Sequence, residues 1–179
     1  MVLAHDTAPD TLVTTYLHMT SRDQLQAEYA DEFSGSVRME RMQQPDVAFY
    51  RFLYSAVGEI WRWRDRHYLS NEDLKAAIGD PNTSVYVMYV DGVPAGYVEL
   101  VRRGGDTEIA YFGIRPDFMG RGLGKHLLSY GIARAWDEGA QRVWVHTCNL
   151  DSPHALNNYM KRGMSIYDVH YEPMPERYA

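Results

Sequence analysis

The sequence predicts a mixed α/β fold, and three observations support this prediction. Four β-rich segments can form one sheet, namely residues 84–90, 93–101, 107–114 and 142–147. Asp91 and Gly92 join the first two, and this pair is typical of the tight turn of an antiparallel hairpin. The third segment follows a second glycine turn and extends the hairpin to three strands. The fourth follows a long amphipathic helix, and a crossover of that kind makes a strand parallel to its neighbour.

Shorter patterns predict the elements of the first 80 residues. They indicate a strand over residues 11–20, a polar loop or added element over 21–36, and helices over 48–57 and 71–78. Ser70 or Asn71 can cap the second helix. The chain has 179 residues, of which 45% are hydrophobic, so it can bury one sizeable core and is short for two. We therefore expect a single domain over residues 1–179.

The overall charge and the cysteine count narrow the class of protein. The net charge is −6, which argues against non-specific nucleic-acid binding and is compatible with a cationic or amine partner. A single cysteine excludes an internal disulfide, and no Lys or Arg precedes Arg22 as a secretory leader would need. No apolar stretch approaches the length that spans a membrane. We expect a cytoplasmic protein with no membrane and no nucleic-acid partner.

A glycine-rich run lies between the third predicted strand and the long helix. It consists of Gly120, Arg121, Gly122, Leu123, Gly124 and Lys125. Glycines let the backbone pass close to a ligand, and the first turn of a helix presents unpaired N–H groups with a partial positive charge. The run therefore predicts a site for a phosphate or diphosphate group.

Two common phosphate-binding motifs do not match this run. A Walker-type loop needs a glycine where Met119 stands and a hydroxyl residue where His126 stands. A dinucleotide-binding fingerprint needs a third glycine where Lys125 stands. Both motifs are therefore set aside.

Further motifs surround the glycine run in a recognisable order. An Ile-x-Pro strand exit that begins at Ile114 precedes the run, and an A-x-x-x-Y-x-x-x-G pattern centred on Tyr159 follows it. In this order, residues 83–172 resemble the GNAT (N-acetyltransferase) superfamily. The resemblance implies a mostly antiparallel central sheet flanked by helices, in which a pair of parallel strands splays apart to admit acetyl-CoA. Residues 1–80 would form the acceptor side, and residues 83–172 the acyl-CoA-binding core.

The resemblance also implies which residues hold acetyl-CoA, the acyl donor. Backbone N–H groups of the glycine run would bind the diphosphate, and the side chains of Arg121 and Lys125 would add charge. The amides of the pantetheine arm could pair with a strand formed by Phe112, Gly113 and Ile114. The sequence departs from the family at two positions. Met119 replaces a Gln or Arg of the loop, and Ser152 replaces an Asn that would supply an amide.

Acetyl transfer to an amine needs a base for the amine's proton and an acid for the leaving thiolate. By resemblance, Tyr159 faces the cofactor sulfur and donates the proton, although such a tyrosine can also be a packing residue. Glu108 is the candidate base, directly or through water, and Glu99 is the second choice. Either carboxylate could instead be a solvated strand residue. A backbone N–H within residues 112–114 would polarise the thioester carbonyl.

The acceptor pocket is expected from an aromatic-rich segment in the first half of the chain. Tyr54 belongs to a helical face that is first of all a core pattern. Trp61 and Trp63 are candidates to enclose an ammonium group by cation–π contact. These three residues are therefore predicted to bind the acceptor.

His146 and Cys148 lie two residues apart on one predicted strand, which invites a metal-site interpretation. Zinc usually needs three or more protein ligands in recognisable spacing, and the chain has no second cysteine and no H-x-x-x-H pair. We therefore expect no metal, and we assign His146 to the wall of the acceptor pocket.

These inferences predict an N-acetyltransferase that moves an acetyl group from acetyl-CoA to a primary amine, preferably of a small molecule, by direct attack. Two alternatives stay open: a non-catalytic acyl-CoA-binding or regulatory protein, and a protein or peptide N-acetyltransferase. The tail after Tyr171 is short, so we expect a sheet edge that a second subunit could cover to form a homodimer.

Overall fold

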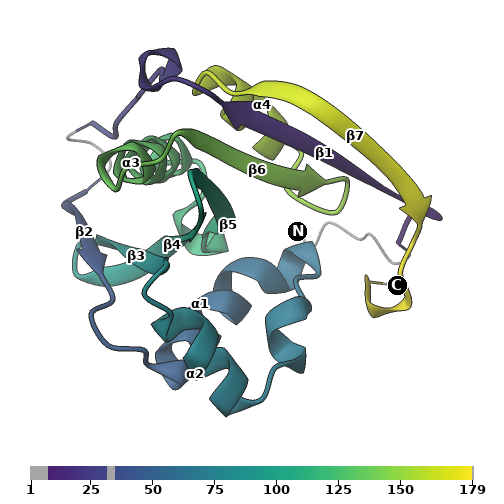
Figure 1. Ribbon diagram of the computed structural model, residues 1–179. Coiled ribbons are helices and arrows are strands. Elements are labelled where there is room, and N and C mark those ends of the chain that lie inside the picture. The colour runs from purple at the N-terminus through teal and green to yellow at the C-terminus, as the bar shows by residue number, and fades with distance from the viewer. Residues whose placement is uncertain (1–7, 32–34, 179) are drawn as a thin grey trace.

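The computed structural model describes residues 8–31 and 35–178, which fold around a seven-stranded sheet with helices on both faces (Figure 1). The strands are β1 (Thr11–Met19), β2 (Val37–Arg41), β3 (Thr83–Val90), β4 (Val93–Arg103), β5 (Asp106–Ile114), β6 (Arg142–Cys148) and β7 (Ser165–Pro173). The α-helices are α1 (Val47–Gly58), α2 (Asn71–Gly79), α3 (Leu123–Asp137) and α4 (Ala155–Lys161). Strand order is β2-β3-β4-β5-β6-β1-β7, and among these described strands only β5 and β6 pair in parallel. The predicted mixed, mostly antiparallel fold is confirmed.

Local sequence signals explain where several elements begin and end. Asp91 and Gly92 have φ angles of 51° and 81°, as the predicted turn between β3 and β4 requires. The Ser70 side chain accepts a hydrogen bond from the Asp73 N–H (3.0 Å), so the predicted cap of α2 is confirmed. The long helix that was predicted after the glycine run begins at residue 123, because Gly122 adopts a left-handed conformation (φ 72°).

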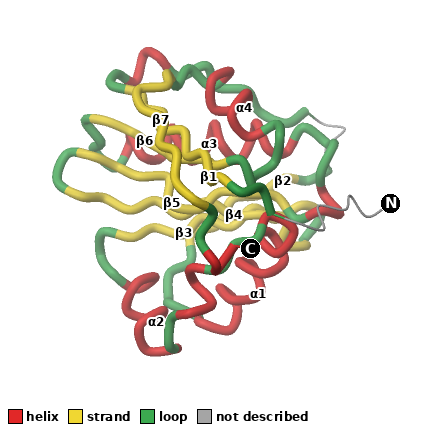
Figure 2. Tube along the Cα trace, turned by 90° about the vertical axis from the view of Figure 1, so that its right-hand side faces the viewer, coloured by secondary structure: helices red, strands yellow, loops and turns green. Residues whose placement is uncertain are grey.

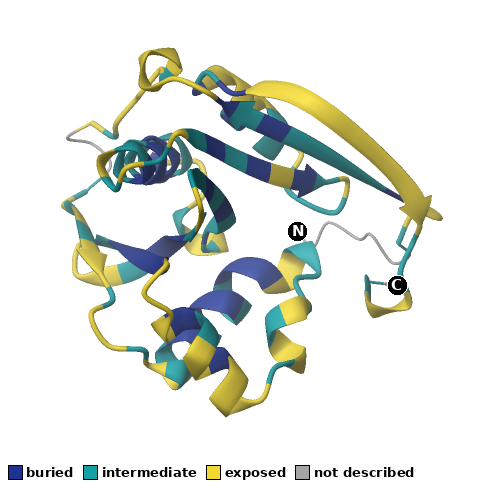
Figure 3. Cartoon of the chain, viewed as in Figure 1, coloured by how far each residue is buried: buried dark blue, intermediate teal, exposed yellow. Residues whose placement is uncertain are grey.

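The sheet separates two hydrophobic cores, and the alternation of side chains along β3 divides its residues between them. Val85 and Val87 pack with α1 and α2, whereas Tyr86 and Met88 point to the opposite face and pack with α3. Tyr54 is 1% exposed, which confirms the predicted core face of α1. Figure 3 shows part of α1 as buried, buried residues alternating with less buried ones along β6, and β7 as exposed along its length.

The first strand of the chain lies among the last ones, because β1 is inserted between β6 and β7 (Figures 1 and 2). β2 is at the opposite edge, so the residues that follow β1 must cross the sheet. In this crossing segment (residues 20–31), the Glu28 N–H donates to Ser129 Oγ (2.8 Å) and the Ala30 N–H donates to His126 Nδ1 (3.0 Å). The part of the predicted polar stretch that the structure describes here, residues 21–31, therefore contacts α3, whereas residues 32–34 lie outside the described residues.

β7 forms the edge of the sheet beside β1 and ends at Pro173. Its backbone has a strand partner on one side, while the other side faces away from the sheet. Such edges can pair with a second chain. Formation of a homodimer through this edge stays a prediction.

Candidate active site

The two parallel strands separate soon after they meet. Pairing between β5 and β6 ends at Glu108 and Trp144. Just beyond, Ala110 is an extra residue in β5, because the register with β4 shifts between Glu99 and Leu100. A bulge of this kind bends its strand and interrupts pairing. The predicted splay of β5 and β6 is therefore present, and the bulge gives its physical cause.

A cavity of about 590 Å³ lies between the splayed strands and the start of α3. All predicted cofactor residues except Arg121 line it, namely Phe112, Gly113, Ile114, Gly120, Gly122, Leu123, Gly124, Lys125 and Ser152. The same cavity is lined by Tyr159 and by the predicted acceptor residues Tyr54, Trp61, Trp63 and His146. Arg121 is outside this lining, and its guanidinium lies 4.0 Å from the Asp91 carboxylate. The structure thus brings residues of both predicted halves to one site.

The start of α3 has the features of an anion site. Gly122 is the N-cap residue, and within the described chain no side chain caps the first turn of the helix. Its N–H groups therefore stay available to a ligand, and the helix dipole favours negative charge there. Gly120 also has positive φ (76°), and a Cβ added to it would meet nothing within 4 Å. These residues fit the diphosphate of coenzyme A, with Lys125 as the adjacent cation.

A carboxylate of the crossing segment reaches the mouth of this anion site. Glu28 lines the cavity, forms an ion pair with Lys125, and accepts a hydrogen bond from Arg162 (3.0 Å). Hydrogen bonding from Lys125 is the main reason why the pKa of Glu28 is lowered. Sequence reasoning missed Glu28, because no local motif marks a residue that reaches α3 from almost 100 positions earlier. The carboxylate of Glu28 thus offsets part of the positive charge of these two basic side chains.

Tyr159, on α4, lines the cavity and also packs in the core next to α3. The residue is 6% exposed, and its ring meets Phe112 edge to face, with centroids 6.0 Å apart. Burial raises the pKa of Tyr159 above its ordinary value, and the nearby Asp151 carboxylate adds to the shift. The phenol therefore stays protonated in ordinary buffers and is suited to donate a proton.

The two candidate bases have different surroundings. Glu108 lies at the point where β5 and β6 separate, and its Oε1 is 3.8 Å from Nδ1 of His146, a cavity residue. Glu108 itself does not line the cavity. Glu99 is 0% exposed, accepts a hydrogen bond from the Tyr50 hydroxyl (2.5 Å) and forms an ion pair with Arg66. Burial raises the pKa of Glu99, but its partners enclose it away from the cavity.

Trp63 belongs both to the core and to the cavity wall. Its ring centroid lies 5.4 Å from that of Tyr54 and 5.4 Å from that of Tyr111. A Cβ on Gly58 would lie 2.3 Å from the indole, so only glycine allows this approach. The indole N–H donates to Asp151 Oδ1 (3.4 Å), which links the acceptor side to the loop after β6.

Asp151 organises that loop, although the sequence analysis did not identify it. Its carboxylate accepts hydrogen bonds from the Thr147 hydroxyl (2.7 Å) and the Cys148 N–H (2.9 Å). An Asp placed just after a strand and before a Ser-Pro pair is a turn signal that could have identified it. The thiol of Cys148 lines the cavity, but burial raises its pKa to about 11, which does not favour thiolate chemistry.

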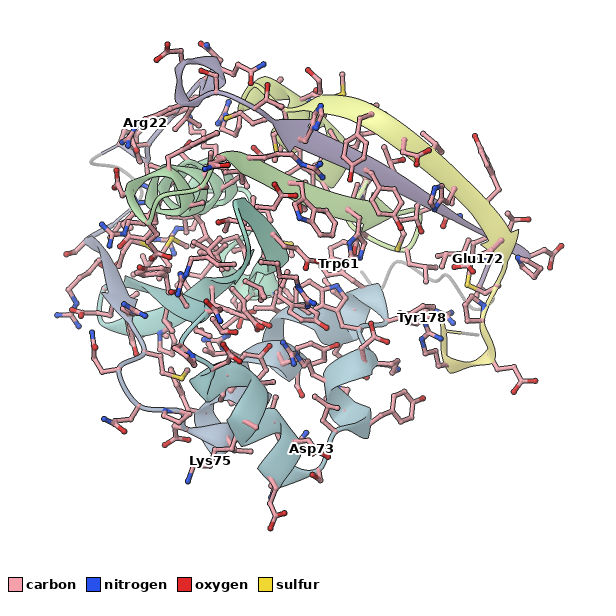
Figure 4. All side chains as sticks on the ribbon, in the orientation of Figure 1. Arg22, Trp61, Asp73, Lys75, Glu172 and Tyr178 are labelled. Atoms are coloured by element: carbon pink, nitrogen blue, oxygen red, sulfur yellow. The ribbon has the colours of Figure 1, made fainter. Side chains whose placement is uncertain are left out.

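A short helical turn near the C-terminus, Glu176–Tyr178, which we call the C-terminal turn, closes one side of the cavity. Tyr178 lines it, and its carbonyl accepts a hydrogen bond from Arg62 (2.7 Å). The Tyr178 hydroxyl donates to Asp65 (3.0 Å), which also pairs with Arg177 (3.2 Å). Figure 4 shows Trp61 and Tyr178 between the helical part of the chain and strands β6, β1 and β7. Sequence reasoning missed this wall, because its contacts join distant parts of the chain.

Two features are absent from residues 8–31 and 35–178, the part of the chain that the structure describes. Within it, no group of three or more His, Cys, Asp or Glu side chains could hold a metal ion. Over the same residues, no helix combines the length and apolar composition that crossing a membrane requires.

Comparison with known proteins gives consistent matches. A model of the acetyltransferase (GNAT) family matches residues 23–164. An uncharacterised N-acetyltransferase of Lactobacillus delbrueckii subsp. lactis is 33% identical over 114 residues, which cover 56% of this chain and 62% of that relative. The chain thus spans less than two thirds of the relative's length.

Solved structures show the same fold. A GCN5-related N-acetyltransferase from Sphaerobacter thermophilus matches with a TM-score of 0.65 at 17% identity, over 92% of this chain and 52% of that one. An acetyltransferase from Bacillus subtilis, solved in complex with CoA, matches with a TM-score of 0.55 at 22% identity, over 72% of this chain and 76% of that one.

Proposed function

This chain belongs to the acetyltransferase (GNAT) family, and from that premise we propose that it transfers an acetyl group from acetyl-CoA to a primary amine of a small molecule. One observation carries the proposal. A single cavity reaches from the uncapped start of α3, past Tyr159, to the side chains of Trp61, Trp63 and Tyr178. The first end suits a diphosphate, and the second, walled by aromatic rings, suits an amine. A cytoplasmic location is part of the proposal.

The proposed reaction is a direct attack of the amine nitrogen on the thioester carbonyl carbon. A C–N bond forms and the C–S bond breaks. An acceptor that binds as an ammonium ion loses one proton to Glu108 before the attack and a second to solvent as the amide forms, while the thiolate gains one proton. Glu108 accepts the amine's proton, directly or through a water molecule, with His146 between it and the cavity. Tyr159 donates the proton that the thiolate gains. A backbone N–H within residues 112–114 polarises the carbonyl.

Thiol release from acetyl-CoA in the presence of a panel of primary amines tests the proposal. We expect release only when an amine is present, with an equal amount of acetylated amine detected by mass spectrometry. Coenzyme A binding without turnover of any amine would favour the second candidate function, a non-catalytic acyl-CoA-binding protein. Release with peptide amines alone would indicate a peptide or protein N-acetyltransferase.

Glu28→Gln is expected to tighten coenzyme A binding by about two- to fivefold at low ionic strength. The variant removes the carboxylate that now pairs with Lys125 and Arg162, which leaves both cations to the phosphates of the ligand. Calorimetry at two salt concentrations checks this, and the gain should shrink at high salt. Glu72→Gln, on α2, is the control. Weaker binding by Glu28→Gln would show instead that Glu28 positions the two basic side chains.

Trp61→Ala is expected to raise the KM for the amine by about three- to thirtyfold, because a cation–π contact is lost. The KM for acetyl-CoA should change by less than about twofold, because the ring is on the acceptor side. Trp61→Phe keeps an aromatic face and should recover most of the affinity. Equal changes in both KM values, or a lowered melting temperature alone, would assign Trp61 to packing.

A further inference from the structure

Ring-bearing side chains from three neighbouring strands lie together on one face of the sheet. We call this set the ring face, and its members are Tyr16, His18, Trp144, His146, Tyr167 and His170. The register of β1 and β6 places Tyr16 opposite His146 and His18 opposite Trp144. Ring centroids are 5.7 Å apart for Tyr16 and His146, and 4.6 Å apart for His18 and Tyr167. The rings therefore form a continuous surface.

This surface differs from the opposite face of the same strands. There, Leu17 and Val143 are fully buried in the core beneath α3 and α4. On the ring face, Tyr167 is 42% exposed and the side chain of His170 is 60% exposed. Among the described residues, the core formed by α1 and α2 includes members from β3, β4 and β5 but none from β6, β1 or β7. Contiguous exposed rings of this kind mark a binding surface rather than a core.

The ring face is continuous with the cavity through His146. This side chain lines the cavity, and its ring also lies 6.1 Å from that of Trp144. Glu108, the proposed base, is 3.8 Å from it on the same side. An acceptor whose amine nitrogen is near Glu108 can therefore extend over the rings of Tyr16 and Trp144.

Carboxylates dominate the charge around the ring face. Burial raises the pKa of Tyr16, and the negative charges of Asp168, Glu172 and Glu108 add to the shift. Figure 4 shows Glu172 toward the C-terminal end of β7. A ligand carrying positive charge would meet a favourable potential here.

Two basic side chains at the ring face already have acidic partners. Arg142 lies 3.7 Å from Asp106, and its guanidinium is placed over the ring of Tyr167 at 5.2 Å from the centroid. His170 Nε2 is 2.9 Å from Asp168. The chain's own Arg142 thus shows that a cation can be accommodated against these rings.

We propose that the ring face is an acceptor subsite that binds an organic cation, such as a second ammonium group, at the far end of the amine that is acetylated. The inference rests on the proposed function, because His146 joins this subsite to the acceptor end of the cavity. Rings attract ammonium groups through their negative faces, and neighbouring carboxylates strengthen the attraction. The acceptor class is then a diamine or polyamine.

Three acceptors with the same six-carbon chain test the proposal: hexylamine, 1,6-diaminohexane and 6-phenylhexylamine. For the unaltered protein, we expect kcat/KM to be about tenfold higher for the diamine than for hexylamine, beyond the factor of about two that its two equivalent amines supply. Tyr16→Leu and Trp144→Leu should each reduce the preference, measured as the ratio of the two kcat/KM values, to about that statistical factor. Tyr171→Leu, which removes an exposed ring paired with Val13 rather than Tyr16, is the matched control and should keep the preference.

Several outcomes would overturn the proposal. A preference that survives in both ring variants would place the second ammonium group elsewhere, and a stronger preference for the phenyl tail would indicate ring stacking instead of cation binding. If no amine is acetylated, the proposed function fails, and calorimetry with 1,6-diaminohexane then tests the subsite separately. Binding that is lost in Tyr16→Leu would support the subsite, whereas equal or absent binding would exclude it. Thermal melts establish that each variant is folded.

Discussion

Tyr159→Phe is expected to lower kcat by a factor of about one hundred or more, because the phenol that protonates the thiolate is removed. The ring that meets Phe112 edge to face is retained, so the fold and the dissociation constant of coenzyme A should hardly change. Steady-state kinetics and calorimetry on the same preparations separate these two effects. Tyr130→Phe, on α3 and outside the cavity, is the matched control.

The pH dependence gives a second measurement on Tyr159. Burial raises the pKa of its hydroxyl above the ordinary value of 10.0, so the proton-donating form persists to more alkaline pH than for a free phenol. In the unaltered protein, kcat should therefore show no decline from loss of this proton up to a pH of about 10. Turnover by Tyr159→Phe that equals the unaltered rate across this range would remove the tyrosine from the mechanism.

The cofactor half of the site could be predicted from sequence because its residues are close together in the chain. The strand that ends at Ile114, the glycine run and the start of α3 are consecutive, so local backbone preferences determine their geometry. Tyr159 could be placed by its spacing within one short helix. Gly120 and Gly122 both have positive φ, which is a local conformation that glycine favours.

The remaining parts of the site depend on contacts between distant segments. No local pattern places β1 between β6 and β7, yet this insertion creates the ring face and makes the next residues cross α3. Glu28 reaches Lys125 only because of that crossing, and Tyr178 reaches Asp65 only because the C-terminal turn returns to the helices. Pairing of distant segments is a property of topology, which short motifs do not encode.

The sequence also could not decide whether Glu99 or Glu108 is the better candidate base. Both lie on strands of one meander, and alternation alone leaves either of them buried or solvated. The extra residue at Ala110 reverses the side-chain alternation of β5 and separates the strands beside Glu108. Glu99, by contrast, forms an ion pair with Arg66, a residue that lies 33 positions earlier in the chain. Neither the bulge nor the ion pair has a sequence signal that could have decided between the two carboxylates.

Glu108→Gln is accordingly expected to lower kcat/KM for the amine by about a hundredfold or more at neutral pH, because the amide keeps the shape of the side chain but cannot accept the amine's proton. Coenzyme A affinity should stay unchanged. As the pH rises, the variant should regain activity in step with the fraction of acceptor that is already deprotonated, which relieves the need for a base. Glu40→Gln, an exposed carboxylate on β2, is the control.

A companion variant identifies the path of the proton. If the proton reaches Glu108 by way of His146, whose Nδ1 is 3.8 Å away, then His146→Asn should reproduce both the loss of activity and the recovery at high pH. If a water molecule carries the proton past the ring, His146→Asn should mainly raise the KM for the amine, because the imidazole then only forms part of the wall. Unchanged kcat/KM in Glu108→Gln would exclude this carboxylate as the base. Glu99 could not replace it, because Arg66 and Tyr50 enclose that side chain. The acceptor would then have to lose its proton to solvent before attack.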